Sequence, residues 1–527
     1  MGDRDNLPEL PKGWLWTPLP NLGELNRGKS KHRPRNDPKL FGGKYPFIQT
    51  GDVRNSNGII KSYSQSYNEF GLKQSRLWSE NTLCITIAAN IAETALLGIQ
   101  ACFPDSIVGF SSDEQICTVK YVFYFIKTVK NKLESYAPAT AQKNINLETL
   151  KNLLIPLSPI TEQHRIVAKI EELFSELDAG VELLKKLKAK LKRYRQAVLK
   201  AAVEGKLTKD WREAHQGEIE PASVLLERIL KERREKWEAE QLAQMKAKGK
   251  TPKDDSWKLK YKEPVAPDTS DLFELPEGWV WSRAEQVCDF ITKGTTPKAE
   301  KLYSSSGEIP FIKVYNLTNH GLLNFNINPT FISKDTHLQE LARSRVLPGD
   351  VLMNIVGPPL GKVSVVPETY PEWNMNQAIA VFRPMPSYNQ KFLCFSLMAE
   401  NILLWAKRRA KATAGQFNLT LEICRDLPLP LPSALEQHYI IEELERCFSV
   451  TDELEKVINQ NLKPSEKLRQ SILKKAFEGK LVPQDPTDEP ADKLLERIKA
   501  EKAKREAEAK AKKKRKQPGK SQQLELF

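Results

Sequence analysis

The sequence contains few of the residues from which disulfide frameworks and metal sites are built. Its 527 residues include seven cysteines, with no Cys-x-x-Cys pair, and six histidines, with no His-x-x-x-His or His-Glu pair. Scattered cysteines of this kind are typical of small buried residues in a reducing compartment. We therefore expect no disulfide framework, no bound metal ion and a cytoplasmic location.

Catalytic motifs and long apolar runs are absent from the sequence as well. It has no Asn/Asp-Pro-Pro-Tyr/Phe motif for amino-methyl transfer, no Pro-Asp…Asp/Glu-x-Lys nuclease core and no Gly-x-Ser-x-Gly elbow. The most apolar stretch, residues 83–99, is interrupted by Asn90 and Glu93 and is too short to cross a bilayer. We therefore expect a soluble protein that binds a partner and has no catalytic activity of its own.

Basic residues outnumber acidic ones, and this imbalance indicates the class of partner. Lys and Arg total 81 against 67 Asp and Glu, which gives a formal net charge of +14. An excess of this kind favours a polyanion such as nucleic acid, although basic residues also solvate helix faces. The length allows about three or four domains, so a large nucleic-acid-binding protein is compatible with both observations.

Most of the sequence is present twice. Three motifs recur: residues 195–207 (RQAVLKAAVEGKL) as 469–481 (RQSILKKAFEGKL), the tripeptide Glu-Gln-His at 162–164 as 436–438, and residues 10–16 (LPKGWLW) as 275–281 (LPEGWVW). The first two motifs return after 274 positions. This period far exceeds the roughly 20–50 residues of a solenoid repeat, so a whole domain with a long helix is duplicated.

The two copies of the duplicated domain are rich in short apolar runs. In residues 1–158 and 272–433 these runs are separated by Gly, Pro and Asn, which is typical of β-strands and turns. The frames agree, since the tripeptide Pro-Phe-Ile at 46–48 aligns with the one at 310–312, whereas most loop residues differ. The pattern predicts two β-rich domains that bind different targets through their loops.

Each β-rich domain is followed by a long amphipathic helix. Apolar residues recur every three or four positions through 159–208 and 434–482, with Lys and Glu on the other faces. Pro464 lies inside the second segment, where we expect a kink or break. Because each apolar stripe needs a partner, the predicted fold class is α+β: two β-rich domains in pseudo-two-fold tandem, joined by two long helices packed as an antiparallel coiled coil. A charged helix and linker at 209–271 and a short helix with a basic C-terminal tail at 483–527 complete the chain.

Residues 23–30 (GELNRGKS) match the phosphate-loop pattern Gly-x-x-x-x-Gly-Lys-Ser. Such a loop binds nucleotide only between a buried strand and the start of a helix. The flanking residues 17–22 and 31–34 predict a poor strand and a poor helix, and the second copy has lost the pattern. We interpret the match as a coincidence. A P-loop ATPase with coiled-coil arms and a two-armed scaffold that binds no DNA remain the alternatives.

Basic and polar residues cluster in two kinds of segment that are suited to DNA. One kind is the turn at 27–35, whose counterpart in the second copy is 293–298. The other kind of segment precedes the final strand of each β-rich domain. Such side chains hold phosphates and reach base edges in the major groove, although any one of them can also be solvated. The candidate DNA-binding residues are Arg27, Lys29, Lys31, Arg33, Arg35, Gln142, Lys143, Asn144, Lys293, Thr295, Thr296, Lys298, Arg408, Arg409, Lys411, Gln416 and Asn418.

The repeated motifs resemble those of one known family. The openings at 10–16 and 275–281, the junctions LIPLSPITEQH and LPLPSALEQH, and the helix ends LKxAxEGKL are similar to those of specificity subunits of type I restriction–modification enzymes. The resemblance covers essentially the whole chain. It implies two target-recognition domains, each reading one half of a bipartite, asymmetric DNA site. It also implies paired helices that set the spacer between the half-sites and dock two methyltransferase subunits.

The same resemblance implies that the chemistry belongs to partner subunits. The methyltransferase subunits would use S-adenosylmethionine, and motor–nuclease subunits would use ATP and Mg²⁺. This chain would then bind double-stranded DNA and those subunits, but no cofactor and no membrane. The linker at 209–271 and the Lys-rich tail are longer than these roles require.

The extreme C-terminus carries a further short motif. Residues 523–527 (QLELF) form an apolar tip on a Lys-rich tether, similar to the Gln-Leu-x-Leu-Phe peptides that dock on the bacterial replication clamp. The alternatives are a frayed end or a contact within the protein's own complex.

Deleting residues 523–527 tests the clamp interpretation. If the tip docks, the shortened chain should lose measurable affinity for the purified clamp while its affinity for DNA stays the same. Binding of both chains to the immobilised clamp is the measurement. Equal affinity of the two chains would mean that the tip is a frayed end or serves the protein's own complex.

Overall fold

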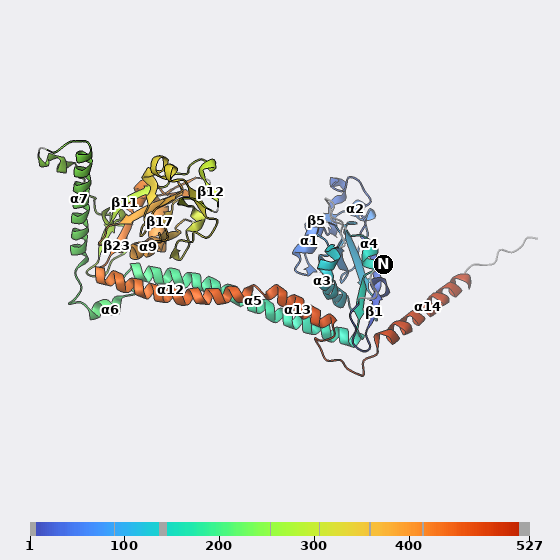
Figure 1. The fold of residues 1–527 in the computed structure, drawn as a ribbon. Helices are drawn as coiled ribbons and strands as arrows, with labels where there is room; N and C mark the ends of the chain where they lie inside the picture. Colours follow the sequence, from blue (N-terminus) through green and yellow to red (C-terminus); the bar gives the residue numbers. More distant parts are fainter. Residues whose placement is uncertain are drawn as a thin grey trace, which may run out of the picture. The chain divides into compact units, whose positions relative to one another are not determined.

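The computed structural model describes residues 7–88, 90–135, 145–252, 254–304, 306–357, 360–413 and 416–515 (Figure 1). The chain forms two units, of which the first comprises residues 1–184 and 460–527 and the second residues 185–459. Each unit contains one β-rich domain together with part of both long helical segments. Within the described ranges, no helix is long and apolar enough to span a membrane.

The β-rich domain of the first unit is built on a five-stranded sheet. The strands lie in the order β2 (Gly23–Arg27), β8 (Ile107–Ser112), β6 (Leu83–Thr86), β7 (Thr94–Leu97) and β4 (Ile59–Ile60). Neighbours are antiparallel except β4 and β7, which are parallel. Leu83 and Ile85 join one core with α3 (Val119–Ser135), whereas Cys84 joins a second core. The sheet is therefore buried on both faces, which explains the continuous apolar runs in the sequence.

The second unit repeats this sheet strand for strand. Its order is β11 (Cys288–Lys293), β20 (Ile379–Pro384), β17 (Val351–Asn354), β18 (Val363–Val365) and β14 (Gly321–Leu322). The two strands at the far end, β14 and β18, are again parallel, and the other neighbours are antiparallel. Val351 and Met353 join one core and Leu352 another. The predicted duplication is thus confirmed at the level of topology.

Smaller sheets and short helices complete each domain. In the first unit, β1 (Leu15–Pro18) pairs with β9 (Leu154–Leu157) and β3 (Phe41–Phe47) with β5 (Gln65–Tyr67). In the second, β10 (Val280–Arg283) pairs with β23 (Pro428–Leu431), and a further sheet has the order β12 (Tyr303–Ser304), β15 (Thr330–Ile332), β13 (Ile309–Ile312), β19 (Trp373–Met375), β16 (Arg345–Val346). The short helices are α1 (Thr50–Asn55), α2 (Glu69–Lys73), α4 (Leu147–Lys151), α8 (Ala284–Val287), α9 (Gln390–Met398), α10 (Glu400–Arg409) and α11 (Leu421–Asp426).

The long helix α5 (Ile160–Val203) packs antiparallel against two successive helices. Within the second unit its later part lies along α12 (Ala434–Leu462), as Figure 1 shows. Lys188 donates to the Asn459 side chain at 2.8 Å, and further along α5 Arg195 pairs with the earlier residue Asp452. The order of these partners runs opposite to the order along α5, which confirms the predicted antiparallel pairing.

In the first unit the earlier part of α5 lies along α13 (Ser465–Phe477). The guanidinium of Arg469 pairs with Asp178 and stacks over the Phe174 ring at 4.7 Å. The break between α12 and α13 falls at Pro464, which caps the start of α13. Proline cannot supply the helical N–H, so the predicted interruption at this position is confirmed.

Each helical segment ends in a left-handed glycine that meets an opening motif. Gly205 has φ +65° and Gly479 has φ +68°. Added Cβ atoms there would come within 2.4 Å of Pro276 Cγ and 2.3 Å of Pro11 Cγ, respectively. Only glycine takes this φ without strain and leaves room for the proline ring. The repeated Glu-Gly-Lys-Leu sequence is therefore a helix stop that docks on the Leu-Pro-x-Gly-Trp opening.

The segment that follows each helix stop also docks on an opening motif. The Ala222 N–H, at the start of α7 (Ala222–Ala247), donates to Gly278 O at 2.9 Å. The Ala491 N–H, at the start of α14 (Ala491–Arg515), donates to Gly13 O at 3.0 Å. Helix α14 is longer than the short helix expected there. The first domain is completed by residues from the C-terminal part of the chain, and the second by residues that follow α5, including α6 (Lys209–Ala214).

A buried glutamate in the first turn of each long helix joins these segments. Trp14 Nε1 donates to Glu162 at 2.8 Å, and Trp279 Nε1 donates to Glu436 at 2.7 Å. The two carboxylates differ in their other partners. Glu436 also accepts from Thr208 at 2.6 Å and from Arg212 at 2.5 Å.

Glu162 lacks comparable partners. Its Oε1 is buried without a hydrogen-bond partner among the described residues, and burial raises the pKa of this carboxyl group. The same architecture therefore carries a well-compensated carboxylate in the second unit and a poorly compensated one in the first.

The cysteines lie where the sequence predicted them. Six of the seven are buried, and Cys447 on α12 is half-buried. Burial raises the pKa of the Cys394 and Cys424 thiols to about 12. At neutral pH these thiols are protonated, and they act as small apolar side chains.

The two buried glutamates should respond differently to the same substitution. We expect Glu436→Gln to destabilise the chain by about 2 kcal/mol, because hydrogen bonds to a charged acceptor from Arg212, Thr208 and Trp279 are weakened. Glu162→Gln should cost less, because the amide keeps an acceptor for Trp14 and removes a poorly compensated buried charge. Thermal unfolding midpoints of the two variants are the measurement. An equal loss in both variants would contradict the difference.

Candidate nucleic-acid interface

The segments predicted to contact DNA in the second unit follow strand ends that share one edge of the sheet. Lys293, the last residue of β11, is opposite Ala380 near the start of β20. Asn354, the last residue of β17, is opposite Ile379, the first residue of β20. The loops after β11 and β17 and the loop before β20 therefore meet there. We call this the loop edge of the sheet.

The turn after β11 is held against the sheet by its backbone. The Gly294 N–H donates to Ile379 O at 3.0 Å, and an added Cβ would come within 2.1 Å of Asn376 O. Thr296 accepts from the Gln377 N–H at 3.3 Å, and Thr295 accepts from Arg343 at 3.3 Å. The two predicted threonines are thus already engaged.

The lysines of this turn are not engaged. Lys293 and Lys298 are exposed, and neither ammonium group has a hydrogen bond or ion pair among the described residues. Ammonium groups held on a fixed backbone and left free are suited to phosphate contacts.

A β-hairpin lies at the same loop edge. It comprises β21 (Lys411–Thr413) and β22 (Gln416–Asn418). The Gly357 N–H donates to Phe417 O at 3.1 Å, and a β-bridge joins Val356 to Asn418. The structure therefore brings the hairpin with Lys411, Gln416 and Asn418 to the edge that also carries the turn 293–298.

The two predicted arginines before the hairpin occupy the end of α10. Arg408 is exposed, and its guanidinium has no partner among the described residues. Arg409 lies 4.0 Å over the Trp405 ring and 3.6 Å from Asp271. Arg408 is therefore the freer of the two for a phosphate.

The first unit presents an equivalent loop edge. Arg27, the last residue of β2, is opposite Val108 of β8, and Thr86 of β6 is opposite Ile107. Gln142, Lys143 and Asn144 lie outside the described residues. Ile145, which follows them, donates its N–H to Ile87 O at 3.0 Å, beyond the end of β6.

The predicted cations of the first unit divide into bonded and free ones. The Arg27 side chain donates to Asp105 O at 3.1 Å, and that of Arg33 to Ser30 O at 2.6 Å. Arg35 forms an ion pair with Asp105 at 2.7 Å. Lys29 and Lys31 are exposed, and their ammonium groups have no partner within the described ranges. The two lysines are therefore better candidates than the three arginines.

The phosphate-loop match is a strand followed by a turn. Residues 23–27 form β2, and the Gly28 N–H donates to Ile107 O at 2.8 Å. An added Cβ at Gly28 would come within 2.3 Å of Phe103 O. No α-helix starts after Ser30, because the next helical turn is a 3-10 turn at Pro38–Leu40. The segment cannot cradle a nucleotide as a P-loop does, since the backbone amides do not converge on a helix start.

A hollow beside this turn, lined by polar and aromatic side chains, was not foreseen from the sequence. Its volume is about 700 Å³, and its lining includes Arg35, Asn36, Gln49, Gln65 and Phe41. Gln49 donates to the Gln65 side chain at 2.7 Å. Amide groups of this kind can bond base edges. These residues come from four separate segments, so no sequence motif connects them.

The described residues offer nothing that indicates a metal centre. They contain no group of three or more His, Cys, Asp or Glu side chains that could hold a metal ion. What the two units share is a sheet with exposed lysines at one loop edge, which is chemistry for binding a polyanion.

Two domains of one topology, each exposing cations at the same edge of its sheet, define a two-domain nucleic-acid-binding protein. The sequence profile described as "Type I restriction modification DNA specificity domain" matches residues 11–193 and 276–464. The chain therefore belongs to the family of type I restriction–modification specificity subunits. It is a non-catalytic DNA specificity subunit with two target-recognition domains, as the resemblance implied.

Curated relatives agree with this assignment, and solved structures share the fold. The chain is 28% identical over 399 residues to the EcoBI specificity subunit of Escherichia coli, covering 73% of this chain and 72% of the relative. It is 24% identical over 516 residues to the EcoKI subunit of E. coli strain K12, covering 94% and 97%. A structure titled as the complex assembly and conformational transition of the type I R-M system has TM-score 0.62 at 17% identity, covering 90% of this chain and 100% of that one. The HsdS subunit from Thermoanaerobacter tengcongensis has TM-score 0.51 at 17% identity, with the same coverage.

Removing the two free lysines of the first unit should weaken binding in a salt-dependent way. We expect the Lys29→Ala, Lys31→Ala double variant to lower the slope of log K against log salt by about two, roughly one for each lost phosphate contact. Binding of a labelled duplex at several salt concentrations measures this slope. The matched control is Lys169→Ala, Lys231→Ala, which removes two lysines that pair with glutamates along their own helices. A slope equal to that of the control would contradict the assignment.

Proposed function

We propose that the loop edge of each sheet reads one half of a bipartite, asymmetric site in double-stranded DNA. The observation that carries this proposal is that the two domains share one strand order but differ in the loops at the loop edge. The strand orders β2-β8-β6-β7-β4 and β11-β20-β17-β18-β14 are the same. The turns that leave β2 and β11 run to the next 3-10 turn at 28–37 and 294–298, and they differ in length and sequence.

The proposed contacts are those of the sequence analysis, ranked by the structure. The free cations are Lys29 and Lys31 in the first domain and Lys293, Lys298 and Arg408 in the second, and they are proposed to contact phosphates. Base recognition is proposed for the amides of the hairpin residues Gln416 and Asn418 and for Gln142 and Asn144. The remaining candidates, Arg27, Arg33, Arg35, Lys143, Thr295, Thr296, Arg409 and Lys411, would support these contacts or fix the turns.

The proposed division of the chain follows the repeat. Residues 1–158 and 272–433 are proposed as the target-recognition domains, and 159–208 and 434–482 as the spacer helices. Residues 209–271 and 483–527 supply the segments that dock on the opening motifs. The contacts of Ala222 with Gly278 and of Ala491 with Gly13 support a structural role for the start of each segment.

The paired helices are proposed to dock two methyltransferase subunits. In the second unit they leave apolar side chains exposed on the described surface: Leu187 is 40% exposed, Val450 57% and Leu454 44%. Apolar residues in a row on a helix pair favour further helices as partners. Methyl transfer with S-adenosylmethionine, and translocation and cleavage with ATP and Mg²⁺ by motor–nuclease subunits, would then be carried out by the partner subunits.

Exchanging a recognition domain tests the division of labour. We expect that replacing residues 19–153, which lie between β1 and β9, with the corresponding segment of a relative changes one half-site and leaves the other unchanged. The paired strands β1 and β9 and the opening motif stay in place, so the contacts to Glu162 and Gly479 are preserved. Methylation patterns in cells that carry the partner subunits are the measurement. An exchange that altered both half-sites would overturn the proposal.

Lengthening both helices tests their role as a spacer. We propose insertion of about seven residues after Leu187 together with about seven after Asn459, the side chain to which Lys188 donates. Two added turns lengthen each helix by about 10 Å and keep the apolar stripes facing each other. The non-specific spacer in the target should then grow by about three base pairs, with both half-sites unchanged. One-residue insertions at the same places rotate the stripe by about 100° and should abolish assembly. Unaltered spacing in the seven-residue variant would show that the helices do not set it.

A further inference from the structure

An arginine-lined hollow in the second unit lies next to the proposed interface but is not part of any predicted motif. Its volume is about 360 Å³, and its lining includes Phe290, Thr292, Arg343, Arg345, Leu347 and Arg383. Phe290 and Thr292 belong to β11, the strand that leads into the turn 293–298. Arg343 donates to Thr295 of that turn at 3.3 Å. The hollow therefore extends along β11 toward the loop edge, and Arg343 connects it with the turn 293–298.

The guanidinium of Arg383 is fixed from behind by a buried acid. Its Nε and Nη2 donate to the two oxygens of Asp350, both at 2.8 Å, and Asp350 is 2% exposed. The Arg383 guanidinium also lies over the Phe290 ring, 5.4 Å from its centroid. A bidentate pair with a rigid aromatic neighbour holds the planar group in one orientation. Its Nη1 has no hydrogen bond within the described ranges.

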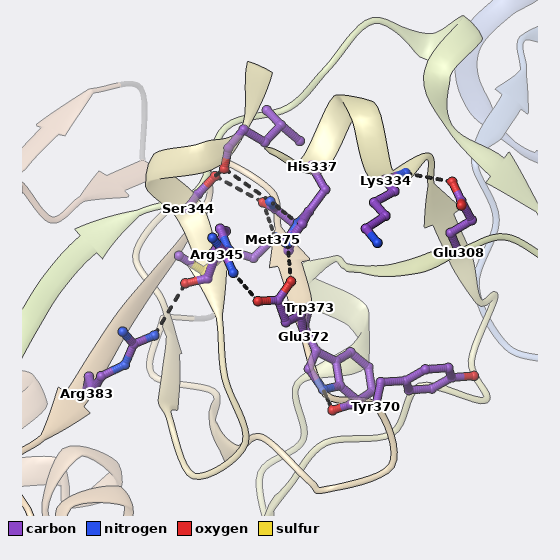
Figure 2. A network of polar contacts seen from close by, with 12 residues as sticks. Glu308, Lys334, His337, Ser344, Arg345, Tyr370, Glu372, Trp373, Met375 and Arg383 are labelled. Carbon is purple, nitrogen blue, oxygen red and sulfur yellow. Dashed lines mark hydrogen bonds and ion pairs between the residues drawn. The ribbon is translucent and has the colours of Figure 1, made fainter. Parts of the chain in front are cut away.

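Arg345 is fixed through a chain of hydrogen bonds, which Figure 2 shows. Its Nη2 pairs with Glu372, and Glu372 also bonds His337 Nε2 at 3.1 Å. Asn374 Nδ2 donates to His337 Nδ1 at 3.0 Å, and its Oδ1 accepts the Met375 N–H at 2.9 Å, which fixes the amide orientation.

This series of hydrogen bonds requires one protonation state of His337. Because Nδ1 accepts a hydrogen bond, Nε2 carries the only ring proton and donates it to Glu372. Burial lowers the pKa of His337, which favours this neutral form, and Arg345 holds the pKa of Glu372 below its usual value. The carboxylate is thus ionised and oriented, and it presents Arg345 to the hollow.

The arginines retain donors for a ligand. A guanidinium carries five N–H donors. Arg343 uses one of them, Arg345 uses one on Glu372, and Arg383 uses Nε and Nη2. Their remaining donors have no hydrogen bonds among the described residues. Three guanidinium groups around one open hollow, backed by two carboxylates, leave an excess of positive charge, and guanidinium groups are suited to hydrogen bonding an oxyanion such as phosphate.

The equivalent place in the first unit has different chemistry. In the strand pair β2–β8, Glu24 is opposite Ser111, whereas in β11–β20 Phe290 is opposite Arg383. Arg76 there is paired with Glu24 at 2.9 Å. Where Arg343 contacts Thr295 in the second unit, the first unit has Ser75, whose hydroxyl donates to Lys29 O at 2.8 Å. The hydroxyls of Ser75 and Ser111 thus occupy the positions of Arg343 and Arg383, and the acid Glu24 occupies the position of Phe290.

We propose that Arg343, Arg345 and Arg383 bind a backbone phosphate of duplex DNA beside the half-site of the second recognition domain. The site rests on the proposed function, because the hollow acts on DNA only if the loop edge of β11 faces it. The contact carries no base information, since it is made to the sugar–phosphate backbone. The second domain would therefore hold DNA more firmly than the first, irrespective of sequence.

The test is the salt dependence of binding by the full-length chain to a labelled random-sequence duplex of about 40 base pairs. We expect Arg343→Gln, Arg345→Gln to lower the slope of log K against log salt by about one relative to the unmodified chain, because one phosphate contact is lost. Arg383 is left in place, because its removal would leave the buried Asp350 without its partner. The matched control, Arg228→Gln, Arg446→Gln, removes two arginines that pair with glutamates on helical segments and should keep the original slope.

Four outcomes decide the proposal. A reduced slope in the hollow variant alone, with its thermal midpoint within about 2 °C of the unmodified chain, supports a phosphate site. If Arg343→Lys, Arg345→Lys restores the slope but not the affinity, the bidentate geometry of arginine is part of the site. Equal slopes in the hollow variant, the control and the unmodified chain overturn the phosphate site while leaving the proposed function intact. Failure of the unmodified chain to bind duplex at low salt overturns both.

Discussion

The buried Glu436 in the first turn of α12 is the contact on which the architecture of the second unit depends. A carboxylate withdrawn from water is stable only when donors surround it, so its partners have to arrive from elsewhere in the chain. Glu436 takes them from the opening motif, through Trp279, and from the segment after α5, through Thr208 and Arg212. The Glu436 side chain thereby joins the opening motif of the second domain, helix α12 and the segment after α5 at one site.

This arrangement makes the two copies structurally interdependent. The end of α5 contributes Val198, Leu199 and Val203 to the core of the second domain. The end of α13 contributes Ile472 and Phe477 to the core of the first. Neither recognition domain has a complete core when the helix that ends beside it is removed. Separating a recognition domain from the helix end that packs in its core would expose a large apolar area. The two copies therefore depend on each other within one chain.

The features that could be predicted from the sequence are those that depend on local pattern or on repetition. The duplication, the long helices and the break at Pro464 required only spacing and the chemistry of proline. The basic turn was also visible, but its arginines were not separable from its lysines, because the acceptor for Arg35 lies far along the chain at Asp105. Arg343 and Arg345 could not be predicted from the sequence, since Arg343 reaches the turn after β11 through its contact with Thr295 and Arg345 is placed by strand pairing with Asn374.

The two copies differ in charge at positions outside the buried faces of the sheets, because substitutions there do not disrupt the cores. Both faces of each five-stranded sheet are buried, so a polar replacement there leaves a group without hydrogen bonds and is strongly destabilising. The loop edge has no such constraint, and neither does the outer side of β2 or β11. At one such position the first copy has Glu24, paired with Arg76, and the second has Phe290, stacked under Arg383. The frame can therefore be kept while its affinity for a polyanion changes, because the residues that determine that affinity contribute little to the cores.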